Sequence, residues 1–184
     1  MIRVLRACAL ALVVLIPAMT ATAHAADTAD ITVTVTIQNL SLTLSSSTWA
    51  LGTVVAASTT QMTEANDITA SNDGNVDEDF TLRLTNPAAW TAGAAAGADV
   101  FVLSGLFCGA ADAPGGGDFN ADDVMTTSAQ PATATIFGYV GGSADGEAVS
   151  AGSSVDLWLE FGAPTSSSSF TEQTITVTVG AVAS

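Results

Sequence analysis

The stretch that decides the expected fold reads Asp30-Ile31-Thr32-Val33-Thr34-Val35-Thr36-Ile37-Gln38. Apolar and polar side chains alternate through it without a break, which is the period of a β-strand with one buried and one exposed face. Both kinds of residue are β-branched and favour strands. The far end of the chain nearly repeats the pattern, in Gln173-Thr174-Ile175-Thr176-Val177-Thr178-Val179. The sequence therefore predicts a β-domain that begins and ends with matching amphipathic strands.

The first residues have the pattern of a secretory signal peptide. Arg3 and Arg6 precede an apolar run over residues 7–16, and Ala23-His24-Ala25 places small residues at the two cleavage positions. The apolar run is shorter than the roughly 20 residues that a membrane span requires. We expect residues 1–25 to be removed, and the mature protein to be secreted, without a membrane span, to the cell surface or the medium, with the periplasm as the alternative.

The mature chain is strongly acidic. Removing residues 1–25 takes away the only histidine, His24, and two of the three basic residues. Arg83 is then the only basic residue beside 18 acidic ones, and the net charge is 1 − 18 = −17. Nucleic-acid binding requires clustered lysine and arginine and is excluded on this composition. The remaining segment, residues 26–184, has the size of a single domain with its own core.

Catalytic chemistry is poorly supplied. Without histidine or lysine in the mature chain, neither a Ser-His pair nor a lysine nucleophile can be built, so no catalytic residue is predicted and we expect no enzyme. A carboxylate hydrolase would need two carboxyl groups that converge in a cleft. Cys108 ends an apolar run and is expected to be a buried small side chain, unable to form a disulfide within the mature domain.

Alternating patterns recur through the chain and end at turn signals such as Asn72-Asp73-Gly74-Asn75. They predict an all-β, immunoglobulin-like β-sandwich of about eight strands, with long loops around residues 56–66, 86–99 and 108–131. Between the terminal strands, further strands are expected at residues 40–44, 67–71, 80–85, 100–107, 133–140 and 155–161.

Two kinds of ligand site remain open. Asp118-Phe119-Asn120-Ala121-Asp122-Asp123 places oxygen ligands in a glycine-rich loop, so that Asp118, Asn120, Asp122 and Asp123 are a candidate calcium site. The alternative is a solvated loop whose side chains form its own turns. Trp158 lies opposite the apolar residues of its strand and is a candidate platform for a glycan, or else packs under a loop.

The strand, Asn-Asp-Gly turn and strand from Ile68 to Leu84 resemble the immunoglobulin-like modules of exported bacterial surface proteins. Camelysin and TasA-like biofilm fibre subunits show a similar arrangement after a signal peptide. The resemblance implies subunits that assemble by lending an amino-terminal strand to the next copy.

These observations predict a non-enzymatic, secreted structural protein, a homo-oligomer or filament that forms a cell-surface or matrix fibre through β-strand contacts. Its self-assembly strand would present Ile31, Val33, Val35 and Ile37. Two placements are open for this strand: beside the last strand of its own sandwich, or in the sheet of a neighbouring subunit. The alternative function is a secreted module that binds calcium or carbohydrate, with no other cofactor expected.

Overall fold

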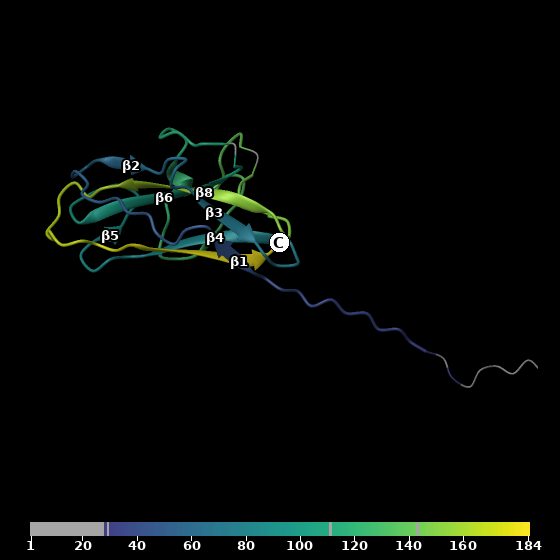
Figure 1. Cartoon of the computed structure of the whole chain (residues 1–184). Coiled ribbons are helices and arrows are strands. Elements are labelled where there is room, and N and C mark those ends of the chain that lie inside the picture. Colours follow the sequence, from purple (N-terminus) through teal and green to yellow (C-terminus); the bar gives the residue numbers. More distant parts are fainter. Residues whose placement is uncertain (1–27, 29, 111, 143) are drawn as a thin grey trace, which may run out of the picture. The chain divides into compact units, whose positions relative to one another are not determined.

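The computed structural model describes residues 28, 30–110, 112–142 and 144–184, and residues 37–184 form one compact unit, separate from the unit that precedes it. The described part is almost entirely β, and Figure 1 shows its strands in two layers. The all-β sandwich predicted from the sequence is confirmed. The strands are β1 (Leu42–Leu44), β2 (Thr59–Gln61), β3 (Ile68–Asn72), β4 (Glu78–Thr85), β5 (Thr91–Ala92), β6 (Val100–Cys108), β7 (Gln130–Pro131), β8 (Ser154–Gly162) and β9 (Thr176–Ala183), with one 3-10 turn, η1 (Ala121–Asp123).

The larger sheet is built around β8 and has the order β1-β3-β8-β6-β5. One edge of β8 pairs first with β3 and then with β2, while β6 pairs along the other edge; all three partners are antiparallel to β8. β5 adds to β6 in the parallel direction. The two long central strands thereby carry most of the face that meets the second sheet.

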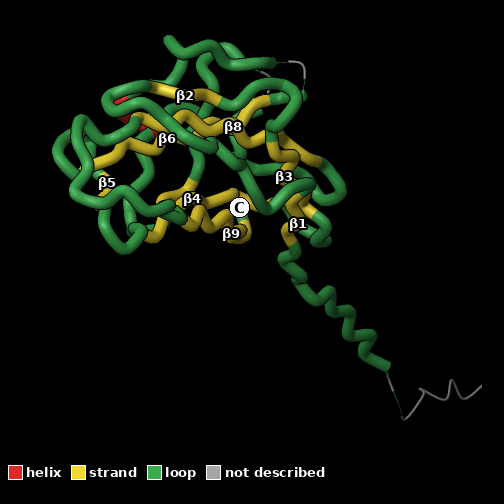
Figure 2. Tube along the Cα trace, turned by 60° about the vertical axis from the view of Figure 1, so that its left-hand side comes forward, coloured by secondary structure: helices red, strands yellow, loops and turns green. Residues whose placement is uncertain are grey.

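The smaller sheet has the order β7-β4-β9, so β9 is an edge strand of the described fold. β9 pairs antiparallel with β4 along its whole length, from Glu78 opposite Ala183 to Thr85 opposite Thr176. Figure 2 shows β4 and β9 together on one side of the sandwich and β6 and β8 on the other. This arrangement leaves the second edge of the last strand open.

The core lies between the two sheets. Phe80 of β4 and Phe107 of β6 meet with ring centroids 5.7 Å apart, and both side chains are fully buried. Phe101 stacks on Phe161 of β8 at 6.0 Å. Edge-to-face and offset aromatic pairs of this kind add to the free energy gained from burying their area. The alternation of β4 and β8 therefore specifies which side chains face inward, as the sequence predicts.

Two predicted strands are absent from the described chain. Residues 30–40 form no strand, so the strand predicted at residues 30–38 is absent from the described chain, while the partner of this segment stays a prediction. Residues 133–140 form bends with one isolated bridge, between Gly138 and Phe107, and Phe137, with a positive φ of 58°, inserts its buried ring into the core from this loop. Arg83, as predicted, is exposed.

The strands β2, β5 and β7 lie inside segments that the sequence predicts as loops. Each has only two or three residues and pairs with a short part of a longer strand. A segment this short shows no alternating pattern by which the sequence could predict it. In the part of the chain that the structure describes, no helix has the length and apolar character needed to cross a membrane.

Candidate functional site

An apolar groove of about 1190 Å³ lies between the two sheets. One wall comes from the inward face of the large sheet, with Leu157, Leu159 and Phe161 of β8. The opposite wall is β9 and the residue before it, with Ile175, Val177 and Val179. The groove therefore runs beside the open edge of the last strand.

The small sheet is incompletely covered at this groove. The inward side chains of its central strand, Leu82 and Leu84 of β4, are 0% and 1% exposed. The corresponding side chains of β9, Val177 and Val179, face the same core but are only half-buried. Apolar side chains in a finished sandwich pack to the density of a crystal. The half-buried state of β9 is what is expected of a strand at the edge of a sheet.

The chemical character of the groove is distinct from that of the rest of the molecule. The chain carries 18 acidic residues, yet among the described residues Glu172 is the only charged one that lines the groove. The remaining lining side chains are apolar or carry a hydroxyl or an amide. A surface of this kind favours an apolar occupant with few charges, and it also leaves the backbone groups on the outer edge of β9 available for strand pairing.

A covering segment extends along the groove between β1 and β2. Residues 46–57 form no strand, and we call them the strap. Figure 1 shows the strap as the blue line that leaves β1, runs along the sandwich and turns back into β2. Its apolar side chains Trp49, Leu51 and Val54 are half-buried and pack against the core. The strap thus supplies apolar cover without supplying a strand.

The amphipathic segment Ile31–Ile37 keeps its apolar side chains in solvent. The exposed fraction of these side chains ranges from 79% for Ile37 to 88% for Ile31. Four β-branched apolar residues on one face of an extended segment are the composition of a buried strand, not of a solvated tail. The described chain therefore contains an amphipathic segment with exposed apolar side chains and an apolar groove beside an edge strand.

Residues 37–41 are attached to the turn between β3 and β4. The side-chain amide of Asn75 donates to the carbonyl of Ile37 and accepts from the backbone N–H of Asn39, both at 2.8 Å. We call these two bonds the Asn75 clamp. A few residues further on, the buried carboxylate of Glu78 accepts from the N–H of Ser41 at 2.8 Å. The clamp determines where the chain leaves the sandwich.

The predicted calcium ligands serve mainly as local caps. Asp118 accepts from the N–H of Gly115 at 2.6 Å, and Asn120 accepts from the N–H of Asp122 at 3.0 Å. Asp123 is buried, and its two carboxylate oxygens accept from the N–H groups of Asn120 and Phe137. Among the described residues, no group of three or more acidic, histidine or cysteine side chains could hold a metal ion. Calcium binding stays a prediction.

Burial of Asp123 raises the pKa of its carboxyl group to about 6, although the two N–H donors act in the opposite direction. The reason is that an ionised carboxylate loses its hydration when it is buried. Burial also raises the pKa of Glu160 on β8. These carboxyl groups therefore hold their protons more tightly in the folded chain than in water.

Trp158 is 4% exposed, so the prediction that its ring forms an open platform for a glycan is wrong. It lies on the outer face of β8, and the long loop after β6 approaches this face, where Gln61 of β2 donates to the carbonyl of Pro114 at 2.5 Å. Cys108 is buried, as predicted, and its thiol contacts the carbonyl of Asp112 at 2.9 Å. Burial, with the nearby charge of Asp156, raises the pKa of this thiol to about 12.

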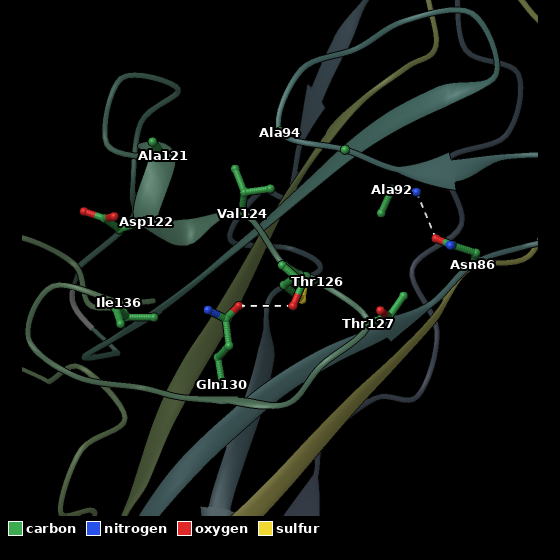
Figure 3. A pocket seen from close by; sticks show the side chains of 12 residues that line it. Asn86, Ala92, Ala94, Ala121, Asp122, Val124, Thr126, Thr127, Gln130 and Ile136 are labelled. Carbon is green, nitrogen blue, oxygen red and sulfur yellow. Dashed lines mark hydrogen bonds between the residues drawn. The ribbon is translucent and has the colours of Figure 1, made fainter.

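A second, smaller cavity of about 440 Å³ lies between β5 and the segment after η1 (Figure 3). Thr126 donates to the side-chain oxygen of Gln130 at 3.4 Å, and Asn86 accepts from the N–H of Ala92 at 2.9 Å. In Figure 3 the carboxylate of Asp122 points away from Gln130 and Thr126. The polar groups of this cavity are directed at the protein's own atoms, and it has no aromatic lining residue.

Sequence reasoning identified the amphipathic segment but missed the groove. The sequence does contain one signal: two segments have the same five residues in the same order, Ile31-Thr32-Val33-Thr34-Val35 and Ile175-Thr176-Val177-Thr178-Val179. The groove itself is assembled from β8, β9 and the strap, which are far apart in sequence. Comparison with known family models and with curated protein sequences finds no match for this chain.

Proposed function

We propose that this protein is a non-enzymatic, secreted structural subunit that polymerises by seating Ile31–Ile37 of one copy in the groove of the next. The observation that carries the proposal is that each of the four apolar side chains of this segment is 79–88% exposed, in a folded chain that also has an open apolar groove. Each feature would lack a role if the monomer were the final state. Each is satisfied by the other in a polymer.

The pairing is chemically complementary. Apolar side chains at alternate positions would enter the groove beside Leu157, Leu159 and Phe161, and the threonines would face outward. Burying the four apolar side chains would contribute roughly 6–12 kcal/mol before entropy losses, at about 1.5–3 kcal/mol each. The open edge of β9 would satisfy the backbone of the incoming strand, as in other strand-addition complexes.

The exit of the chain supports an occupant from another copy. β1 pairs antiparallel with β3, with Leu42 opposite Asn72, so the chain before Leu42 is led past the end of β3 to the turn at Asn75. The Asn75 clamp then holds Ile37 and Asn39 in this direction. An occupant from another copy leaves these bonds in place.

Electron microscopy of the predicted mature chain, residues 26–184, tests the proposal. We expect filaments, and we expect them to be lost when residues 26–38 are deleted. Two substitutions provide a sharper comparison, because Val33→Asp and Thr34→Asp add the same charge on opposite faces of the strand. Val33→Asp should abolish the filaments and Thr34→Asp should leave them. Normal filaments from the truncated chain or from Val33→Asp would contradict the proposal.

A further inference from the structure

The strap is placed where an incoming strand would have to be accommodated. It contributes one wall of the groove, while β8 and β9 contribute the others, so it extends over the side of the sandwich that β9 leaves open. Trp49, Leu51 and Val54 fill part of the space between the sheets. The strap therefore gives the monomer some of the apolar cover that a lent strand would give it completely.

The strap is held almost entirely by these side chains. Its ends are fastened, because Ser45 donates through its N–H to the carbonyl of Thr69 and Ala57 donates to the carbonyl of Pro164, both at 2.9 Å. Between these points, no backbone–backbone hydrogen bond of residues 46–54 is found within the described chain. A segment with few backbone hydrogen bonds and half-buried side chains opens at low cost in free energy.

The backbone of the strap has a positive φ at two positions, one inside its apolar run and one at its carboxyl end. Gly52 has a φ of 62° and Ala57 a φ of 59°. A positive φ is free of penalty for glycine but costs free energy for alanine, because its Cβ crowds the backbone. Ala57 therefore stores strain in the seated strap that would be released if the strap moved away.

We infer that the strap is a displaceable plug, which occupies the acceptor groove of the monomer and is expelled when the strand of another copy enters. The inference rests on the proposed function and adds its regulation. A groove that is partly filled by its own chain is protected from promiscuous strand addition, which is the hazard of an open edge. The apparent Kd for the incoming strand is the intrinsic Kd divided by the fraction of molecules in which the strap is displaced, so a mostly seated strap weakens binding.

Binding of a synthetic peptide of residues 29–38 tests the inference. The acceptor is the mature chain with Val33→Asp and Val35→Asp, which keeps every groove residue but cannot donate its own strand. Gly52→Ala destabilises the seated strap without removing apolar surface, and nothing lies within 4 Å of the added methyl group. We expect it to lower the Kd for the peptide, by up to roughly tenfold if the seated strap dominates the free protein.

The matched variant is Ala57→Gly, which relieves the strain of the seated strap and should raise the Kd. Opposite effects of the two variants are the signature of a plug. If the strap were instead a fixed wall that contacts the guest strand, Gly52→Ala would weaken peptide binding, and this would overturn the inference while leaving the proposed function intact. Absence of peptide binding to every variant, with the Val33→Asp peptide as the blank, would overturn both.

A spin label on the strap provides a second measurement. Ala50 is exposed, and Cys108 is buried, so Ala50→Cys offers the one accessible thiol of the described chain for labelling. Peptide binding should narrow the electron paramagnetic resonance lines of this label, because an expelled strap is mobile. Unchanged or broadened lines on a chain that binds the peptide would show that the strap stays in place, and would contradict expulsion.

Discussion

The side chain of Asn75 takes the place of a strand neighbour for Asn39: its oxygen accepts the N–H of Asn39 at 2.8 Å. Its nitrogen donates to the carbonyl of Ile37. One amide side chain thus makes the two hydrogen bonds that the backbone of a neighbouring strand would make. Ile37 and Asn39 are therefore held at the turn between β3 and β4.

The first prediction concerns this clamp. Asn75→Asp keeps the acceptor for Asn39 and loses the donor to Ile37, whereas Asn75→Ala loses both. Because Asn75 is exposed, we expect a loss of about 0.5–1.5 kcal/mol in the free energy of unfolding for each bond removed. Limited proteolysis should cut residues 37–41 slowest in the wild type, faster in Asn75→Asp and fastest in Asn75→Ala. Equal cutting rates in the three proteins would show that the clamp does not hold the exit.

The second prediction concerns Gly74, in the same turn. A methyl group at this position would collide with the carbonyl of Asn39 and lie 2.7 Å from a carboxylate oxygen of Glu78. Because one contact is to backbone, it cannot be relieved by turning a side chain. We expect Gly74→Ala to lower the free energy of unfolding by about 1–3 kcal/mol, the usual cost of overpacking. Thermal denaturation measures it, with Gly117→Ala, where nothing lies within 4 Å, as the matched control.

The third prediction concerns pH. The pKa of Asp123 is raised by burial from 3.8 to about 6, so the folded chain binds a proton more tightly than the unfolded chain does. Stability from this group is therefore full below about pH 4 and is lost as the pH rises to about 6. The loss amounts to about 3 kcal/mol, because each tenfold difference in proton affinity between the folded and unfolded chains corresponds to about 1.36 kcal/mol. Glu160, whose pKa burial also raises, acts in the same direction.

Urea denaturation at pH 4, 5, 6 and 7 measures this loss. In Asp123→Asn the slope between pH 4 and 6 should be much smaller, because the titrating group is gone. Asp122→Asn, on the exposed neighbour, should leave most of the slope in place, because the charge of Asp122 is the smallest of the causes that raise the pKa of Asp123. A wild-type stability that rises from pH 4 to 6 would contradict the role of Asp123.

The fourth prediction concerns salt, and it rests on the proposed function. Each mature subunit would carry a net charge of 1 − 18 = −17, so that copies repel one another as they meet. Sodium chloride shortens the Debye length from about 10 Å at 0.1 M to about 3 Å at 1 M. We expect polymerisation, followed by light scattering, to start at lower protein concentration in the higher salt.

Calcium chloride at the same ionic strength is the control for this experiment. If screening is the whole cause, the two salts should act alike. A larger effect of calcium that Asp118→Ala and Asp122→Ala together remove would instead point to the calcium site predicted from the loop. Polymerisation that slows with sodium chloride would contradict a barrier of charge repulsion.

The strands with long alternating patterns could be read from the sequence, because their side chains report directly which face is buried. β4 and β8 are examples, and their inward residues Phe80, Leu82, Leu157 and Leu159 are buried as the alternation predicts. Phe137 could not be placed in this way. It is an apolar residue in a segment whose sequence resembles a strand. In the structure it has a positive φ, its N–H donates a hydrogen bond to the carboxylate of Asp123, and its ring enters the core from a loop.

By itself the sequence determined the all-β class, the acidic surface and the amphipathic character of Ile31–Ile37, since these follow from composition and from a period of two. Only the tertiary structure decided that residues 30–40 form no strand in the described chain and that a groove lies beside β9. The reason is physical: alternation shows that a segment needs an apolar partner, but the partner surface is made by β8, β9 and the strap, which only the fold brings together.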